Sequence, residues 1–100
     1  MYSTVIELKR NVSKESLARL RKIAEGAFVN RAGNVRNSSN EPYCLIFEGD
    51  EEAYPCLDLG VADLADMEGF RSQVASWKWL DYDEPGENCD ILKVYAEPVY

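Results

Sequence analysis

Alternating and helical apolar patterns predict a strand and then an amphipathic helix at the start of the chain. Residues 2–9 are rich in β-branched and aromatic side chains and alternate in polarity, as in a half-buried strand. Ser13 suits an N-cap, and apolar residues then recur at helical spacing to about Phe28. Gly26 weakens the last turn and suits a helix end. The expected apolar arc of this helix comprises Leu17, Leu20, Ile23, Ala24, Ala27 and Phe28.

The middle of the chain is expected to hold turns and one buried strand. Residues 30–34 could turn a hairpin between residues 28–29 and Val35. Residues 37–40 are a polar connector, and we expect them to be the most mobile segment. The continuous apolar run at residues 43–47 is typical of a strand that is well covered by other parts of the protein.

A second helix is predicted after an acidic turn and a short strand. Residues 48–52 form the turn, and residues 54–59 suit a strand that Pro55 would confine to a sheet edge. Asp63 or Asp66 could then cap the helix. The apolar stripe of this helix comprises Met67, Phe70, Val74 and Trp77, which recur at helical spacing.

The last part of the chain completes the predicted fold. Residues 77–82 fit either the end of that helix or an alternating strand, in which the two Trp would share a face. Residues 84–88 form a turn and residues 91–96 a final strand. The order β-α-β-β-α-β, with one extra short strand, predicts a single α+β domain over residues 1–100. Two helices would pack on one face of an antiparallel sheet of four to five strands, and a ferredoxin-like arrangement is the leading candidate.

The composition is typical of a globular domain without metal or disulfide cross-links. Apolar residues make up 46% of the chain and charged residues 29%. No apolar run approaches the roughly 18 residues of a membrane span, and the charged first residues do not fit a signal peptide. We therefore expect a cytoplasmic protein without membrane contact. Cys44, Cys56 and Cys89 form no Cys-x-x-Cys pair, and the chain has no His, so we expect neither zinc nor disulfides.

The sequence offers little for catalysis. Without His there is no usual general base, and no Gly-rich phosphate loop is present. Asp81, Asp83 and Gly86 match three positions of an EF-hand loop, but Leu92 stands where a bidentate Glu is required. We therefore expect a non-catalytic protein with no metal site and no cofactor.

Charge is divided very unevenly along the chain. The residues up to Asn40 carry eight bases against three acids, a net of +5, whereas the rest carry three bases against fifteen acids, a net of −12. So lopsided a field attracts a partner of opposite sign and speeds encounter with it.

The acids of the second part predict an exposed negative surface. Carboxylates spaced along a surface can take the places that phosphates fill in a basic groove, so such a surface can block a nucleic-acid-binding site. Aromatic residues beside the acids suit an interface anchor for an Arg- or Lys-rich partner. The candidate partner-binding residues are Asp50, Glu51, Glu52, Asp63, Asp66, Glu68, Trp79, Asp81, Tyr82, Asp83, Glu84 and Glu87.

In length, acidity, lack of catalytic motifs and α+β pattern, the chain resembles small phage-encoded inhibitors of host defence, among them the anti-CRISPR proteins. The resemblance implies an inhibitor that acts in the host cytoplasm. Its partner would be a larger protein with a basic surface, such as a CRISPR effector subunit that grips guide or target strands through Lys and Arg. These proteins share no sequence signature, so the resemblance assigns no site residues.

Two other functions stay open. The basic face of the first helix, with Lys14, Arg21 and Lys22, could bind nucleic acid directly. Alternatively, the positive part of one copy could bind the negative part of another, which would make the protein an assembly subunit whose oligomers depend on salt.

Overall fold

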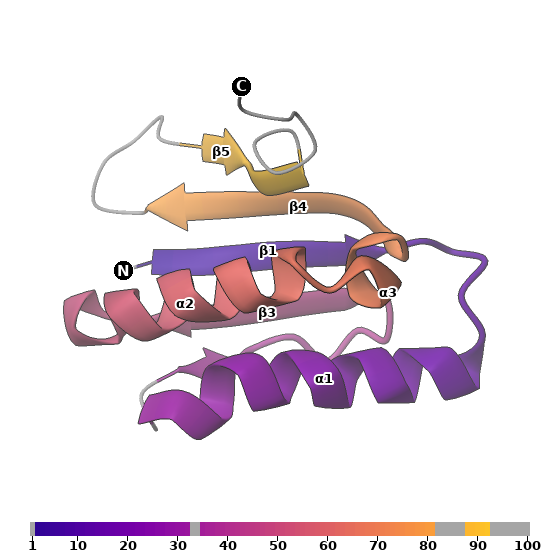
Figure 1. Ribbon diagram of the computed structural model, residues 1–100, viewed down its shortest axis with the longest axis horizontal. Helices are drawn as coiled ribbons and strands as arrows, with labels where there is room; N and C mark the ends of the chain where they lie inside the picture. The colour runs from indigo at the N-terminus through magenta and orange to yellow at the C-terminus, as the bar shows by residue number, and fades with distance from the viewer. Residues whose placement is uncertain (1, 33–34, 82–87, 93–100) are drawn as a thin grey trace.

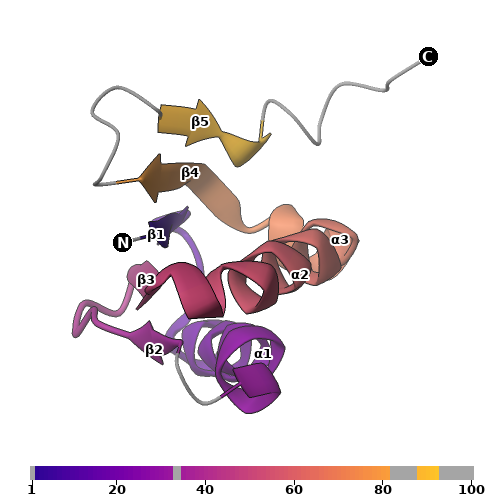
Figure 2. The same ribbon diagram turned by 90° about the vertical axis from the view of Figure 1, so that its left-hand side faces the viewer.

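A five-stranded antiparallel sheet carries the helices on one of its two faces (Figures 1 and 2). The structure is a computed structural model, and it describes residues 2–32, 35–81 and 88–92. The elements in chain order are β1 (Tyr2–Leu8), α1 (Lys14–Ala32), β2 (Arg36–Asn37), β3 (Cys44–Gly49), the 3-10 helix η1 (Glu51–Ala53), α2 (Tyr54–Ala65), α3 (Glu68–Arg71), β4 (Val74–Asp81) and β5 (Asn88–Asp90).

The strand order is β2-β3-β1-β4-β5, so β1 lies at the centre of the sheet. Helix α1 connects β1 to β2 across β3, and α2 with α3 connects β3 to β4 across β1. These are two split βαβ units, the arrangement expected of a ferredoxin-like domain, with β5 added beside β4. The predicted α+β class, with helices on one face of an antiparallel sheet, is confirmed.

The first strand and helix form where the sequence predicts them. The helix cap is confirmed, since the Ser13 hydroxyl oxygen accepts a hydrogen bond of 3.2 Å from the Ser16 backbone N–H. The helix does not stop near Phe28, however, and the hairpin expected at residues 30–34 is wrong, because residues 30–32 still belong to α1. The Phe28 ring is fully buried and stacks on Phe47 at a centroid distance of 4.4 Å. Tertiary packing therefore outweighs the modest penalty of Gly26.

The polar connector at residues 37–40 begins inside the sheet. Asn37 belongs to β2, and its side-chain oxygen accepts hydrogen bonds from the backbone N–H groups of Ser39 and Ile46 at 3.0 and 3.3 Å. The expected mobility of this connector stays a prediction.

The strand expected at residues 54–59 is wrong, because this segment forms the first part of α2. Pro55 lies in the first turn of the helix, where a missing N–H breaks no hydrogen bond. The Asp50 side chain caps the preceding turn by accepting from the Ala53 N–H at 3.2 Å. The acidic turn and the proline are therefore a helix start rather than signs of an edge strand.

The helix expected from Asp63 or Asp66 to about Trp77 is also wrong. Helix α2 ends at Ala65, α3 has four residues, and β4 begins at Val74. The apolar residues of this segment have a helical spacing in the sequence. In the structure, however, they belong to a turn, a short helix and a strand, which follow one another along the chain. Phe70, Val74 and Trp77 do reach the core, whereas the Met67 side chain is 45% exposed.

Residues 77–81 belong to strand β4, as one of the two predicted alternatives requires. Trp77 is fully buried and Trp79 half-buried on the helix-covered face of the sheet, while Lys78 is exposed on the other face. The expected turn at residues 84–88 lies outside the described residues except for Asn88, which starts β5. The strand expected at residues 91–96 is not formed at residues 91–92, which are helical, and its remainder lies outside the described residues.

The core lies between the sheet and the two long helices. Its largest fully buried side chains are Trp77, Phe28, Phe47, Phe70, Ile6, Leu20, Leu45, Leu57 and Leu64. Helices α1 and α2 lie side by side over the sheet, and Gly60 of α2 faces the Phe28 ring of α1 where they meet. At this close approach α2 packs against α1 in the same helical layer. One side of α2 faces the sheet and the other faces solvent (Figure 2).

Candidate interaction surface

The segment from Asp50 to Glu68 concentrates negative charge on one helix and its two flanks. It contains seven carboxylates and no Lys or Arg. In the fold it forms η1, α2 and the start of α3. The acids are Asp50, Glu51, Glu52, Asp58, Asp63, Asp66 and Glu68.

The solvent face of α2 combines these acids with exposed apolar side chains. Tyr54, Leu59 and Met67 are 41%, 51% and 45% exposed, and they are the exposed large hydrophobic residues of the described chain. Asp58 and Asp66 are exposed beside them. We call these five residues the α2 face. Leu57, Gly60, Val61 and Leu64 occupy the opposite, buried side of the helix.

An aromatic cluster supports the N-terminal end of the α2 face. The Tyr54 ring packs edge-on against Tyr2 at 4.8 Å and against Trp79 at 5.6 Å, measured between ring centroids. The predicted anchor Trp79 is thus half-buried beside Tyr54. Most of its ring area holds the start of α2 in place instead of lying open to a partner.

The predicted acidic residues fall into separate groups. Asp50, Glu51 and Glu52 precede α2, whereas Asp66 and Glu68 follow it. Because a helix rises about 1.5 Å per residue, the 12 residues of α2 separate the two groups by roughly 18 Å. Asp58 lies between them on the α2 face, so the surface is a row of carboxylates along one helix and not a single compact cluster.

A hollow of about 520 Å³ separates the C-terminal half of α2 from α1. Asp63 and Asp66 line it together with Lys22 of α1, so a cation shares this space with two of the predicted acids. The remaining lining residues are Ile23, Gly26, Ala27 and Met67. Asp58 and Leu59 of the α2 face lie outside this hollow.

The third predicted group lies mainly outside the described residues. Tyr2 pairs with Gly49 of β3 on one side and with Asp81 of β4 on the other. The turn at Asp50 and the last residue of β4 therefore lie at the same end of the sheet. The side chain of Asp81 and the residues Tyr82, Asp83, Glu84 and Glu87 are not described.

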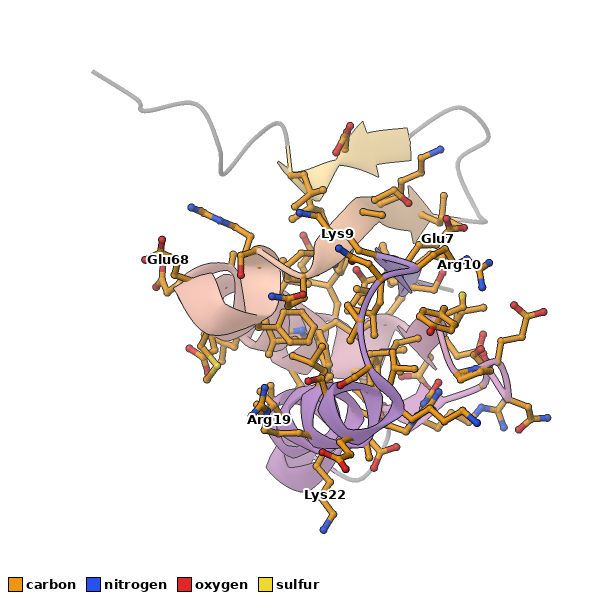
Figure 3. All side chains as sticks on the ribbon, turned by 90° about the vertical axis from the view of Figure 1, so that its right-hand side faces the viewer. Glu7, Lys9, Arg10, Arg19, Lys22 and Glu68 are labelled. Carbon is orange, nitrogen blue, oxygen red and sulfur yellow. The ribbon has the colours of Figure 1, made fainter. Side chains whose placement is uncertain are left out.

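The basic half of the sequence forms a different surface. In Figure 3, Arg19 and Lys22 project from α1 away from the sheet, and Lys9 and Arg10 extend from the segment after β1. Glu68 projects from α3 at the left of the same view. The charge division of the sequence therefore becomes two neighbouring helices of opposite charge.

Sequence reasoning missed four residues of the α2 face, namely Tyr54, Asp58, Leu59 and Met67. A strand at residues 54–59 would alternate Asp58 and Leu59 between opposite faces. A helix that starts at the proline puts both on one exposed arc. The sequence signal that could have identified these residues is Pro55. A proline is favoured in the first turn of a helix, so it could have indicated that α2 begins here.

Cys44 is a half-exposed thiol on the face of the sheet without helices, where it pairs in register with Glu7. Burial raises the pKa of the Cys44 thiol, and Glu7 and Glu41 act in the same direction, while a hydrogen bond with Ser39 and the charge of Arg21 oppose it. The raised pKa disfavours the thiolate, which is the reactive form.

We expect Cys44 to be alkylated slowly. In a Cys56→Ala, Cys89→Ala background, the pH at which iodoacetamide reacts at half its maximal rate should lie above that of the same protein unfolded in urea. The unfolded protein is the control because it keeps the thiol and loses its surroundings. A midpoint at or below the unfolded value would contradict the expected protection.

Within the described residues, no group of three or more His, Cys, Asp or Glu side chains could hold a metal ion. None of the helices in this part of the chain combines the length and the apolar content that a membrane span needs. No family model matches the chain, and comparisons with curated proteins and with solved structures found no match.

Proposed function

We propose that this protein is a non-catalytic binding protein that uses the α2 face to occupy and block a basic surface of a larger protein. The observation that carries the proposal is the segment from Asp50 to Glu68, which has no base and exposes three large apolar side chains, Tyr54 and Leu59 on α2 and Met67 shortly after it. Exposed apolar side chains that lie beside carboxylates in one segment suit an interface with a basic partner.

The two kinds of side chain on the α2 face would have different tasks. Leu59 and Met67 would enter apolar depressions of the partner and supply most of the affinity. Asp58 and Asp66 would pair with its Arg or Lys side chains, which favours fast encounter and the correct orientation. A partner surface with these features is typical of proteins that hold a nucleic-acid backbone, where Lys and Arg lie close together.

The resemblance to phage-encoded inhibitors makes the proposal more specific. The partner would be a CRISPR effector subunit, and the α2 face would occupy part of the positively charged channel that holds guide or target strand. The carboxylates would stand in for phosphates, so bound inhibitor and bound nucleic acid would exclude each other.

In the first test, an arginine-rich peptide that also carries leucines is titrated into the protein, and binding is monitored through the NMR chemical shifts of the protein. Asp58→Lys with Asp66→Lys should weaken binding at least about tenfold, which corresponds to about 1.4 kcal/mol. The matched control is Glu7→Lys with Glu15→Lys, which changes the net charge equally at exposed positions on the open sheet face and on α1. We expect the control to lose less than about threefold.

Equal losses in the two double variants would show that net charge alone drives binding, and would overturn a role for the α2 face. So would chemical shift changes outside residues 50–68. If plain DNA or RNA binds at low salt, and Lys14→Glu with Lys22→Glu abolishes this, the basic helix is the functional surface.

The specific partner is tested with guide-loaded effector complexes in a mobility-shift assay on target DNA. The protein should reduce the shifted fraction, and Asp58→Lys with Asp66→Lys should restore it. An effector that still binds its target fully at saturating protein is excluded as the partner, and an unaffected panel of effector types would remove the CRISPR assignment while leaving the peptide result intact.

A further inference from the structure

A second hollow, of about 360 Å³, lies between the first half of α1 and the segment that leads into β3. It is separate from the α2 face, since no residue of α2 lines it among the described residues. The lining residues are Lys14, Leu17, Ala18, Arg21, Pro42 and Tyr43.

The walls of this hollow are held in place by contacts outside it. The Tyr43 hydroxyl donates to the Val12 carbonyl at 3.1 Å, and the Arg10 guanidinium lies over the Tyr43 ring, 4.9 Å from its centroid. The Arg21 guanidinium donates to the Glu41 backbone carbonyl at 2.8 Å, which ties α1 to the opposite wall. The site is therefore largely formed before any ligand arrives, as ligand sites usually are.

The floor is apolar and the rim is cationic. Leu17 is buried, and its side chain, Ala18, Pro42 and the Tyr43 ring offer carbon surface. Among the described residues, no carboxylate forms an ion pair with Lys14, Arg21 or Arg10, whereas Arg36 has one with Glu48 at 3.2 Å. The exposed Glu41 contacts Arg21 through its backbone and not its side chain.

We propose that this hollow binds a small organic anion, a carboxylate carried on an aromatic ring system. The aromatic part would pack against Leu17, Pro42 and Tyr43, and the carboxylate would lie between Lys14 and Arg21. A cavity of about 150 Å³ is enough for benzene, so 360 Å³ accommodates a bicyclic ring with its acid group. The positive charges at the rim disfavour a cation.

The test is a ¹⁵N NMR titration with 2-naphthoate and, in parallel, with 2-naphthamide, its neutral isostere. The naphthoate should shift the amide signals of Leu17, Ala18 and Tyr43 and bind at least about tenfold more tightly than the amide, as expected for charge-assisted contacts. Lys14→Gln should reduce this preference clearly, because it removes one of the two cations around the carboxylate and leaves Arg21 in place. The matched control is Lys22→Gln, an exposed lysine of the same helix that lines the other hollow.

Equal binding of acid and amide, or signals that shift elsewhere, would overturn the proposal. It would also fail if Lys14→Gln and Lys22→Gln weakened the naphthoate equally, since that indicates a diffuse charge effect. An Asp-rich peptide that perturbs these signals where naphthoate does not would show a docking surface for an acidic protein instead of a small-molecule site. None of these outcomes bears on the α2 face, which lies on a different helix.

Discussion

Gly60→Ala is expected to destabilise the fold, although the same change within a helix usually stabilises it by up to about 1 kcal/mol. A Cβ at this position would lie 2.6 Å from Cε1 of Phe28, closer still to Cδ1, and 3.2 Å from the backbone oxygen of Ala27. No carbon atoms pack at such distances, so either the Phe28 ring or the helix α2 must move.

Moving either the Phe28 ring or helix α2 would disrupt packing in the core. The Phe28 ring is fully buried and stacks on Phe47 at 4.4 Å, and α2 is held against the sheet by Leu57 and Leu64, which are also fully buried. Overpacking a close-packed core typically costs about 1–3 kcal/mol, which exceeds the gain in helix propensity. We therefore expect the free energy of unfolding, measured by urea titration, to fall by about 1–2 kcal/mol.

Gly69→Ala is the matched control for this prediction. Gly69 is exposed in α3, and an added Cβ would meet nothing within 4 Å. Its stability should therefore stay equal or rise slightly. If Gly60→Ala proved as stable as Gly69→Ala, the close contact between α1 and α2 would not exist as described. The position of the α2 face relative to α1 would then be wrong as well.

The elements that the sequence predicted correctly have local signals that agree with their packing. Ser13 caps α1, and the apolar arc from Leu17 to Phe28 is the side of α1 that enters the core. In β1 the alternation matches the sheet faces, since Ile6 and Leu8 are buried while Glu7 is exposed. Where pattern, capping and burial coincide, a local reading is sufficient.

The predictions failed where one local signal had two structural meanings. Pro55 suits an edge strand and the first turn of a helix equally well, and only the position of α2 over the sheet decides between them. The helical spacing of Phe70, Val74 and Trp77 likewise arises across α3 and β4, because separate elements bring these residues to one core. Such coincidences are resolved by tertiary contacts that no short window contains.

In the candidate surface, too, some features follow from the local sequence and others depend on tertiary packing. The sequence identifies which residues are charged, and Asp50, Glu51, Glu52, Asp66 and Glu68 are indeed exposed. It could not show that α2 separates these acids into two groups, or that Asp63, Asp66 and Lys22 line one hollow between α1 and α2. Those facts depend on how α1 and α2 pack together.

Thr4→Val is expected to remove about 1–3 kcal/mol from the free energy of unfolding, because it leaves a buried donor without a partner. The Thr4 hydroxyl accepts a hydrogen bond of 2.6 Å from the indole N–H of Trp77 and donates one of 3.2 Å to the backbone carbonyl of Lys78. Thr4 and Trp77 are both fully buried. Valine has almost the same shape as threonine, so the loss reports on hydrogen bonding and not on packing.

A double-mutant cycle separates the two hydrogen bonds of Thr4 in this prediction. Phenylalanine at position 77 has no N–H, so Thr4→Val in a Trp77→Phe background no longer strands a donor and loses only the bond to Lys78. The change should therefore cost clearly less there than in the wild type, and the difference is the coupling energy of the Thr4–Trp77 pair. Urea unfolding, monitored by circular dichroism, gives the free energy of unfolding of all four proteins.

Equal costs of Thr4→Val in the two backgrounds would mean that the indole N–H finds another partner. The central strand β1 would then be joined to β4 by its backbone ladder without this side-chain bond.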